Sequence, residues 1–334
     1  MKTLNCPNCN SIVYFENDSC INCNATLHFD PRIFNFIQLG NSSNNINDIN
    51  AISKPCINHQ FNLCNWIAAD NADYCVSCKL NNEIPTVGDT ENYQKYIKLE
   101  NAKRQLVYQL LKLKLPVVSK IENNKLGLMF NFIPENNSKG LKTGYMDGTI
   151  TILLKEADAV ERAQIRKLLS EPYRTLIGHF RHEIGHYYFS QLINNQNLSQ
   201  YRNLFGNEEI DYQQSLKRYY QNGPPNNWNA HYISKYASAH PAEDWAETWS
   251  HYLHIIDLLE TAHCNNICFN ENGITLNYID PYNSTDTNTI IHQSIILNIV
   301  ANNLNRSMGI PDTYPFVLPK PMYNKLAFIH SLFS

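Results

Sequence analysis

The sequence predicts an α+β protein, in which a small β module at the N-terminus precedes a mainly helical domain with a small sheet. Three observations support this fold class. Cysteines crowd the first 78 residues, apolar residues recur at helical spacing through most of the rest, and two short strand-like runs interrupt the helices. We place the domain boundary near residue 90, which gives regions 1–90 and 91–334.

The bulk composition is that of an ordinary globular protein. The 334 residues are 43% hydrophobic and 17% charged, enough for one sizeable core and a small accessory module. A net charge of −3 gives no electrostatic reason to expect nucleic acid or an anionic membrane as partner. No apolar run approaches the roughly 20 residues of a membrane-spanning helix, and no hydrophobic signal region opens the chain. We therefore expect a cytoplasmic protein.

The first cysteine block predicts a structural zinc site. Two CxxC pairs are separated by ten residues, and each pair can present two thiolates to one tetrahedral zinc ion; the four residues are Cys6, Cys9, Cys20 and Cys23. A block this short cannot bury enough apolar surface to fold alone, so the metal would supply its folding energy. We therefore predict that region 1–90 contains a metal-stabilised zinc ribbon.

A second, less regular block predicts a second structural zinc. Cys75 and Cys78 form another CxxC pair, and Cys56 and Cys64 complete the set, with His59 as a competing ligand. Closed four-cysteine sites have no open position, so the ribbons would serve folding or the docking of a protein partner. Cys264 and Cys268 lack such neighbours, and we interpret them as plain thiols.

The elements between the ribbons and the candidate site follow in order. Residues 41–50 form a polar stretch that is either an exposed linker or compositional drift. A helix is expected over 92–115, strands over 126–133 and 149–154, and a helix over 156–169. We expect the basic residues of the first helix to form a solvated face; they are Lys95, Lys98, Lys103, Arg104, Lys112 and Lys114.

The central motif is His182-Glu183-Ile184-Gly185-His186, an HExxH sequence on a helix expected to begin near Ser170. Positions i and i+4 share one helix face, so His182 and His186 can reach one metal ion. Glu183 lies where it can take a proton from water at that metal. His179 is on the same face; we favour a hydrogen bond within the core for it over a contact with the site.

A catalytic zinc needs a third protein ligand. The metzincin continuation is absent, because Phe189 and Leu192 occupy its glycine and histidine positions. The richest alternative is a helix expected to open after His240-Pro241. Its Glu243 and Glu247 share a face, so one can bind zinc while the other orients a ligand histidine. A solvated acidic first turn is the alternative, and neighbouring Trp245, Trp249 and Leu253 argue against it.

Several long segments resemble a bacterial family of zinc-binding metallopeptidases with an N-terminal zinc ribbon. They are residues 6–78, PYRTLIGHFRHEIGHYYF at 172–189, YASAHPAEDWAETWSHYLHIIDLLETA at 236–262 and NRSMGIPDTYPFVLP at 305–319. The resemblance implies a zincin-like catalytic domain. A wider similarity to gluzincins implies Glu243 as the third ligand and Glu247 as the supporting residue. It also implies that Tyr236, seven residues before Glu243, steadies an oxyanion, although a core tyrosine would look the same.

These observations together predict a zinc metallopeptidase with one catalytic and two structural zinc ions, acting on a peptide or protein. Residues 149–154 are expected to be an edge strand that pairs with the substrate, with the loop 144–148 as a flexible rim. Two alternatives stay open. One is a zinc-ribbon binding or adaptor protein with an inactive peptidase-like domain, and the other is a zinc hydrolase of a non-peptide amide.

Overall fold

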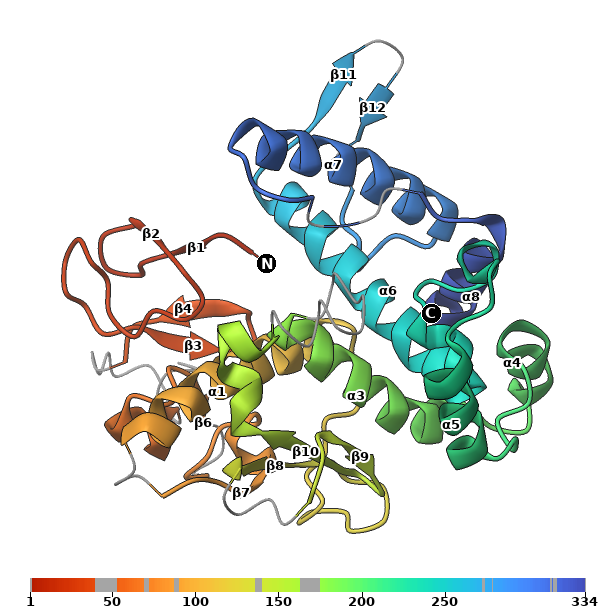
Figure 1. Ribbon diagram of the computed structural model, residues 1–334. Helices are drawn as coiled ribbons and strands as arrows, with labels where there is room; N and C mark the ends of the chain where they lie inside the picture. The colour runs from red at the N-terminus through yellow and green to blue at the C-terminus, as the bar shows by residue number, and fades with distance from the viewer. Residues whose placement is uncertain are drawn as a thin grey trace. The chain divides into compact units, whose positions relative to one another are not determined.

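The computed structural model describes residues 2–39, 53–68, 72–86, 90–135, 140–162, 175–271, 274–277, 279–312, 314 and 317–333. They divide into two compact units, Lys2–Ala157 and Asp158–Ser334 (Figure 1). The predicted linker at 41–50 and the second half of the predicted helix at 156–169 lie outside the described residues, as does Ser170, near which the next helix was expected to begin. No helix in the described ranges is long and apolar enough to cross a membrane.

The N-terminal part of the first unit consists of three two-stranded antiparallel ladders. They pair β1 (Leu4–Asn5) with β2 (Ile12–Val13), β3 (His28–Asp30) with β4 (Asn35–Ile37), and β5 (Lys54–Pro55) with β6 (Ile67–Ala68). The short helices η2 (Ile57–Phe61) and η3 (Cys78–Leu80) flank the second cysteine block. Both cysteine blocks share one aromatic core, because the Phe15 ring lies 5.1 Å from that of Phe29 and 6.0 Å from that of Trp66.

A four-stranded sheet in the order β7-β8-β10-β9 completes this unit. Its strands are β7 (Asn81–Glu83), β8 (Met129–Ile133), β9 (Gly144–Met146) and β10 (Thr149–Leu153), so both predicted strands are present. β8 is parallel to β7 and β10, while β9 is antiparallel to β10. The helix η5 (Leu154–Ala157) follows β10.

The expectation that residues 149–154 form an edge strand is wrong. β10 is paired on both sides, with β8 and with β9. The loop 144–148, expected to be a flexible rim, instead contains strand β9 and the turn of a hairpin, in which Asp147 and Gly148 have φ values of 44° and 75°. Two successive residues with positive φ fit the tight turns that connect twisted strands. The turn folds β9 back onto β10 and covers its edge.

Helix α1 (Thr90–Lys112) confirms the first predicted helix, but its basic residues are not all solvated. Lys103 is completely buried and Arg104 is 4% exposed. The reason is that α1 is covered on two sides: Arg104 donates to the Leu63 carbonyl in the cysteine region, and the Tyr96 ring packs 5.2 Å from that of Phe132 in the sheet. The compact unit therefore includes α1 and the sheet, while the domain boundary near residue 90 stays a prediction.

The second unit is mainly helical. Its elements are α3 (Leu176–Leu192), α4 (Leu198–Phe205), α5 (Tyr212–Asn222), η6 (Trp228–Ala230), η7 (Tyr236–Ala239), α6 (Pro241–Cys264), β11 (Phe269–Glu271), β12 (Ile274–Leu276), α7 (Thr287–Ser307) and α8 (Lys320–Ser331). Helix α6 packs against α3, α7 and α8 (Figure 1). The described part of the chain is thus α+β, with cysteine clusters and small sheets before a helical region, as predicted.

The helix that carries HExxH begins later than expected. Thr175 is extended and its hydroxyl accepts a hydrogen bond of 3.0 Å from the Gly178 N–H, so it caps α3 at Leu176. A threonine hydroxyl at this position satisfies one of the free N–H groups of the first turn. The predicted start near Ser170 is therefore wrong for this helix. The predicted start of α6 is confirmed, with His240 as its cap and Pro241 as its first residue.

Arg104 should matter for the second cysteine cluster. Burial by itself lowers the pKa of Arg104, but negative charge on Cys64, Glu100, Cys78 and Cys75 raises it on balance. The guanidinium thus places a positive charge beside these thiolates, and it also donates to the carbonyl of Leu63.

We predict that Arg104→Met lowers the free energy of unfolding by about 2–3 kcal/mol, because a charged donor to a buried carbonyl is lost. It should also speed the release of zinc from the second cluster to a chelator, since the thiolate charge is no longer offset. Denaturant unfolding and a zinc-release assay measure the two effects. Lys98→Met, at an exposed position of the same helix, is the control. Equal release rates in both variants would contradict the role of Arg104.

Candidate active site and metal centres

Two helices bring the predicted ligand atoms together. His182 and His186 lie on α3 with their Nε2 atoms 3.2 Å apart. Glu243, in the first turn of α6, has Oε2 at 3.1 Å from His182 Nε2 and Oε1 at 3.7 Å from His186 Nε2. Ligands about 2.0–2.1 Å from one tetrahedral zinc are about 3.3 Å from each other. The three side chains therefore have the spacing of ligands around a single zinc ion.

The chemistry of Glu243 also fits a cation. Its side chain is 1% exposed, and within the described residues its Oε2 accepts no hydrogen bond. Burying a carboxylate oxygen without a donor or a cation is costly. The predicted alternative of a solvated acidic turn is excluded for Glu243, because it and the following tryptophan, Trp245, are buried.

Glu247 lies behind His182 and not in the ligand group. Its Oε1 accepts a hydrogen bond of 2.6 Å from His182 Nδ1. Burial raises the pKa of Glu247, but the hydrogen bond and charge of His182 and the charge of His251 more than offset it, so that the pKa is lowered. A carboxylate that holds the Nδ1–H of a histidine leaves the Nε2 lone pair for a metal. The two glutamates therefore have different partners: Glu243 lies beside the Nε2 atom of His182, and Glu247 accepts from its Nδ1.

Glu183 is 6% exposed, and its Oε1 lies 3.3 Å from His179 Nε2. Burial raises its pKa, whereas the hydrogen bond of His179 and the charges of His182, His179 and His186 lower it below the usual value on balance. The carboxylate is therefore held in its ionised form. His179 thus contacts the glutamate of the HExxH motif, which is the alternative to the core hydrogen bond that we favoured for it.

Two tyrosines border the ligand group. The Tyr236 ring is 6.1 Å from that of His182. Burial is the largest cause that raises the pKa of Tyr236, followed by the charge of Glu243 and by the neighbouring tyrosines Tyr212 and Tyr220. Tyr212 was missed in the sequence. Its hydroxyl donates a hydrogen bond of 2.6 Å to Glu243 Oε1, although it lies 31 residues earlier in the chain and belongs to no motif.

Gly185, inside the motif, permits the close approach of α3 and α6. A Cβ atom there would lie 3.1 Å from the Ala246 Cα and 3.2 Å from Trp249 side-chain atoms. The Trp245 indole N–H donates 2.8 Å to the Gly185 carbonyl, which ties the two helices at the same level. The glycine is thus a requirement of the helix contact that sets the ligand distances.

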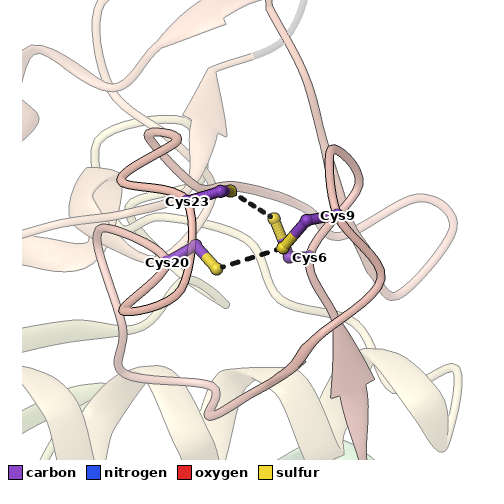
Figure 2. A group of neighbouring side chains, drawn as sticks. All are labelled: Cys6, Cys9, Cys20 and Cys23. Atoms are coloured by element: carbon purple, nitrogen blue, oxygen red, sulfur yellow. Dashed lines mark hydrogen bonds between the residues drawn. The ribbon is translucent and has the colours of Figure 1, made fainter.

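The eight N-terminal cysteines form two four-cysteine groups. The Sγ atoms of Cys6 and Cys23 are 3.7 Å apart and those of Cys9 and Cys20 are 3.6 Å apart (Figure 2). In the second group, Cys64 and Cys75 are 3.6 Å apart and all four cysteines are buried. Thiolates about 2.3 Å from a tetrahedral zinc are about 3.8 Å apart, whereas disulfide sulfurs are about 2.05 Å apart. Both groups therefore fit zinc.

His59, Cys264 and Cys268 lie outside both four-cysteine groups. His59 donates from Nδ1 to the Cys64 carbonyl at 3.1 Å and is not part of the second group, whose members are Cys56, Cys64, Cys75 and Cys78. Among the described residues, Cys264 and Cys268 belong to no group that could hold a metal.

Gly185→Ala should weaken the site without touching a ligand. The added methyl group must push α3 and α6 apart by a few tenths of an ångström, and overpacking of this kind costs about 1–3 kcal/mol. We expect a lower unfolding free energy and weaker retention of the metal at His182, His186 and Glu243. Chemical denaturation and chelator competition would show both. Ser190→Ala, on the exposed side of the same helix, is the control, and equal stability of the two variants would contradict the prediction.

Comparisons with known proteins show which family the chain belongs to. Residues 92–332 match a family described as "Putative zinc-binding metallo-peptidase", and residues 3–89 match a zinc-ribbon domain. Uncharacterized proteins of Mycobacterium tuberculosis and Mycobacterium bovis are each 39% identical to the chain over 336 residues, which cover 99% of it and 95% of the relative. No solved structure matches the chain. The chain therefore belongs to this family of zinc-binding metallopeptidases, with a zinc ribbon at its N-terminus.

Proposed function

We propose that the protein is a zinc-dependent metallopeptidase in which His182, His186 and Glu243 hold the catalytic zinc. The observation that carries the proposal is the meeting of two imidazole Nε2 atoms with a buried carboxylate oxygen that accepts no hydrogen bond in the described part of the chain. When bound, zinc supplies a Lewis acid that polarises a substrate carbonyl and lowers the pKa of water to about 7.

The residues around the ligands have separate roles in this proposal. Glu183 takes the proton from the attacking water and returns it to the leaving amine. His179, 3.3 Å from its carboxylate, holds that group in place. Tyr236 donates a hydrogen bond to the oxygen that becomes negative in the transition state. Glu247 fixes the ring of His182 through the hydrogen bond at Nδ1.

The two cysteine groups hold structural zinc in this proposal, which makes one catalytic and two structural ions. Four thiolates complete a tetrahedral site and leave no position for substrate. A peptide or protein substrate, a protein partner bound through the ribbon and a place in the cytoplasm stay predictions.

Replacing the base tests the mechanism. We predict that Glu183→Gln lowers cleavage of a peptide library by about 10²–10⁴-fold, because a neutral amide cannot accept the proton. Its zinc content should equal that of the wild type, since Glu183 is not among the ligands. Mass spectrometry of the products and metal analysis measure these quantities. Glu209→Gln, at an exposed glutamate, is the control.

Two outcomes would contradict the proposal. Cleavage at the wild-type rate by Glu183→Gln would show that the proposed mechanism is wrong. A wild type that holds the third zinc but cleaves no peptide would favour the adaptor or the non-peptide amide hydrolase.

Metal counting tests the ligands. His182→Ala should lower the zinc content by one ion per chain and leave the two cysteine-bound ions in place, because only one of the three groups loses a member. Elemental analysis after gel filtration gives the count. His231→Ala, at an exposed histidine, should keep the wild-type content. An unchanged count in His182→Ala would rule out the assignment of this histidine.

A further inference from the structure

The two carboxylate oxygens of Glu243 have different surroundings. Oε2 lies 3.1 Å from His182 Nε2 and accepts no hydrogen bond within the described residues. Oε1 accepts the Tyr212 hydroxyl at 2.6 Å and lies 3.7 Å from His186 Nε2. A hydroxyl that donates a short bond to a carboxylate oxygen competes with a cation for that oxygen. The two oxygens are therefore not equivalent towards a metal.

The chain holds Tyr212 at this place through the cap of the ligand helix. His240 caps α6 by accepting the Ala242 N–H at its Nδ1, at 3.0 Å, so its Nε2 carries the proton and donates to the Ile210 carbonyl at 2.9 Å. Ile210 is two residues before Tyr212, and the Tyr212 ring packs 5.1 Å from that of His240. One histidine thus fixes both the start of the helix with Glu243 and the segment that delivers the tyrosine.

The position of Tyr212 is not a by-product of core packing. Tyr212 is the first residue of α5, whose cap Asp211 accepts the Gln214 N–H at 2.8 Å. No residue of α5 is buried, and Tyr212 itself is 37% exposed. The helix therefore contributes little to the core, while its first side chain makes a short hydrogen bond to a ligand residue.

We propose that Tyr212 is a positioning residue that makes Glu243 a ligand through one oxygen only. Its hydroxyl engages Oε1, so that Oε2 alone faces the metal and one coordination position stays open for water and substrate. Without the hydroxyl, Oε1 would turn towards the metal and occupy that position. The proposal rests on the zinc site of the proposed function, but not on the peptide nature of the substrate.

Cobalt spectroscopy of the full-length protein tests this proposal. Co²⁺ replaces zinc, and the spectrum of His182→Ala loaded in the same way is subtracted, which removes the contribution of the cysteine sites. Four-coordinate Co²⁺ absorbs visible light much more strongly than five-coordinate Co²⁺. We expect an intense four-coordinate difference spectrum for the wild type and a severalfold weaker, five-coordinate one for Tyr212→Phe. In cleavage assays, kcat of Tyr212→Phe should fall more than KM changes, because the position lost is the one that water uses.

Tyr219→Phe is the matched control, since it removes a hydroxyl from the same helix and keeps the ring that packs 5.8 Å from Tyr236. Its difference spectrum should equal that of the wild type. A wild-type spectrum retained in Tyr212→Phe, or loss of the metal from folded Tyr212→Phe, would overturn the proposal. If this variant does not fold, the wild type decides alone: a four-coordinate spectrum supports the proposal and a five-coordinate one overturns it.

The same experiment distinguishes a failure of the role proposed for Tyr212 from a failure of the proposed peptidase function. If the wild type shows no difference spectrum, no metal is bound through His182, and both the catalytic zinc site and the role of Tyr212 are wrong. If a four-coordinate spectrum is found in a protein that cleaves no peptide, only peptide hydrolysis is wrong. The spectrum thus tests the tyrosine even when the substrate is unknown.

Discussion

The contact between α3 and α6 is the constraint on which the candidate active site depends. It places two imidazole nitrogens and a buried carboxylate within 3.1–3.7 Å of one another. A buried carboxylate is unfavourable without a compensating charge, and a cation among these atoms would supply it. The helices can come this close because Gly185 has no side chain and its carbonyl accepts from Trp245. Helix packing and the binding of such a cation would therefore support each other.

The first turns of α6 carry three acidic residues with three different partners. Glu243 faces the two histidines of α3, and Glu247 accepts from His182 Nδ1. Asp244 is paired with Lys325 of α8 at 2.5 Å, with both side chains at most 5% exposed. Burial raises the pKa of Asp244 to about 7, against the opposing effect of Lys325. These three acids, which look like a solvated helix start in the sequence, instead contact the candidate site and helix α8.

The cysteine region follows the same electrostatic rule. Four thiolates at distances near 3.7 Å need a cation between them, and in the second group Arg104 adds positive charge from helix α1. The aromatic core of this region also includes Tyr108 of α1, whose ring lies 5.5 Å from Phe15. The ribbon is therefore packed into the same unit as α1 and the sheet, although the family comparison separates residues 3–89 from 92–332.

The sequence by itself determined the features that depend on short spacing. An i, i+4 histidine pair must share a helix face, CxxC pairs present two thiolates together, and apolar periodicity located α1, β8 and β10. Only the tertiary structure decided which distant groups meet. Tyr212 reaches Glu243 across 31 residues, Arg104 is buried against Leu63, and β9 folds over the edge of β10. Local spacing cannot specify such contacts, because they arise from how separate elements pack.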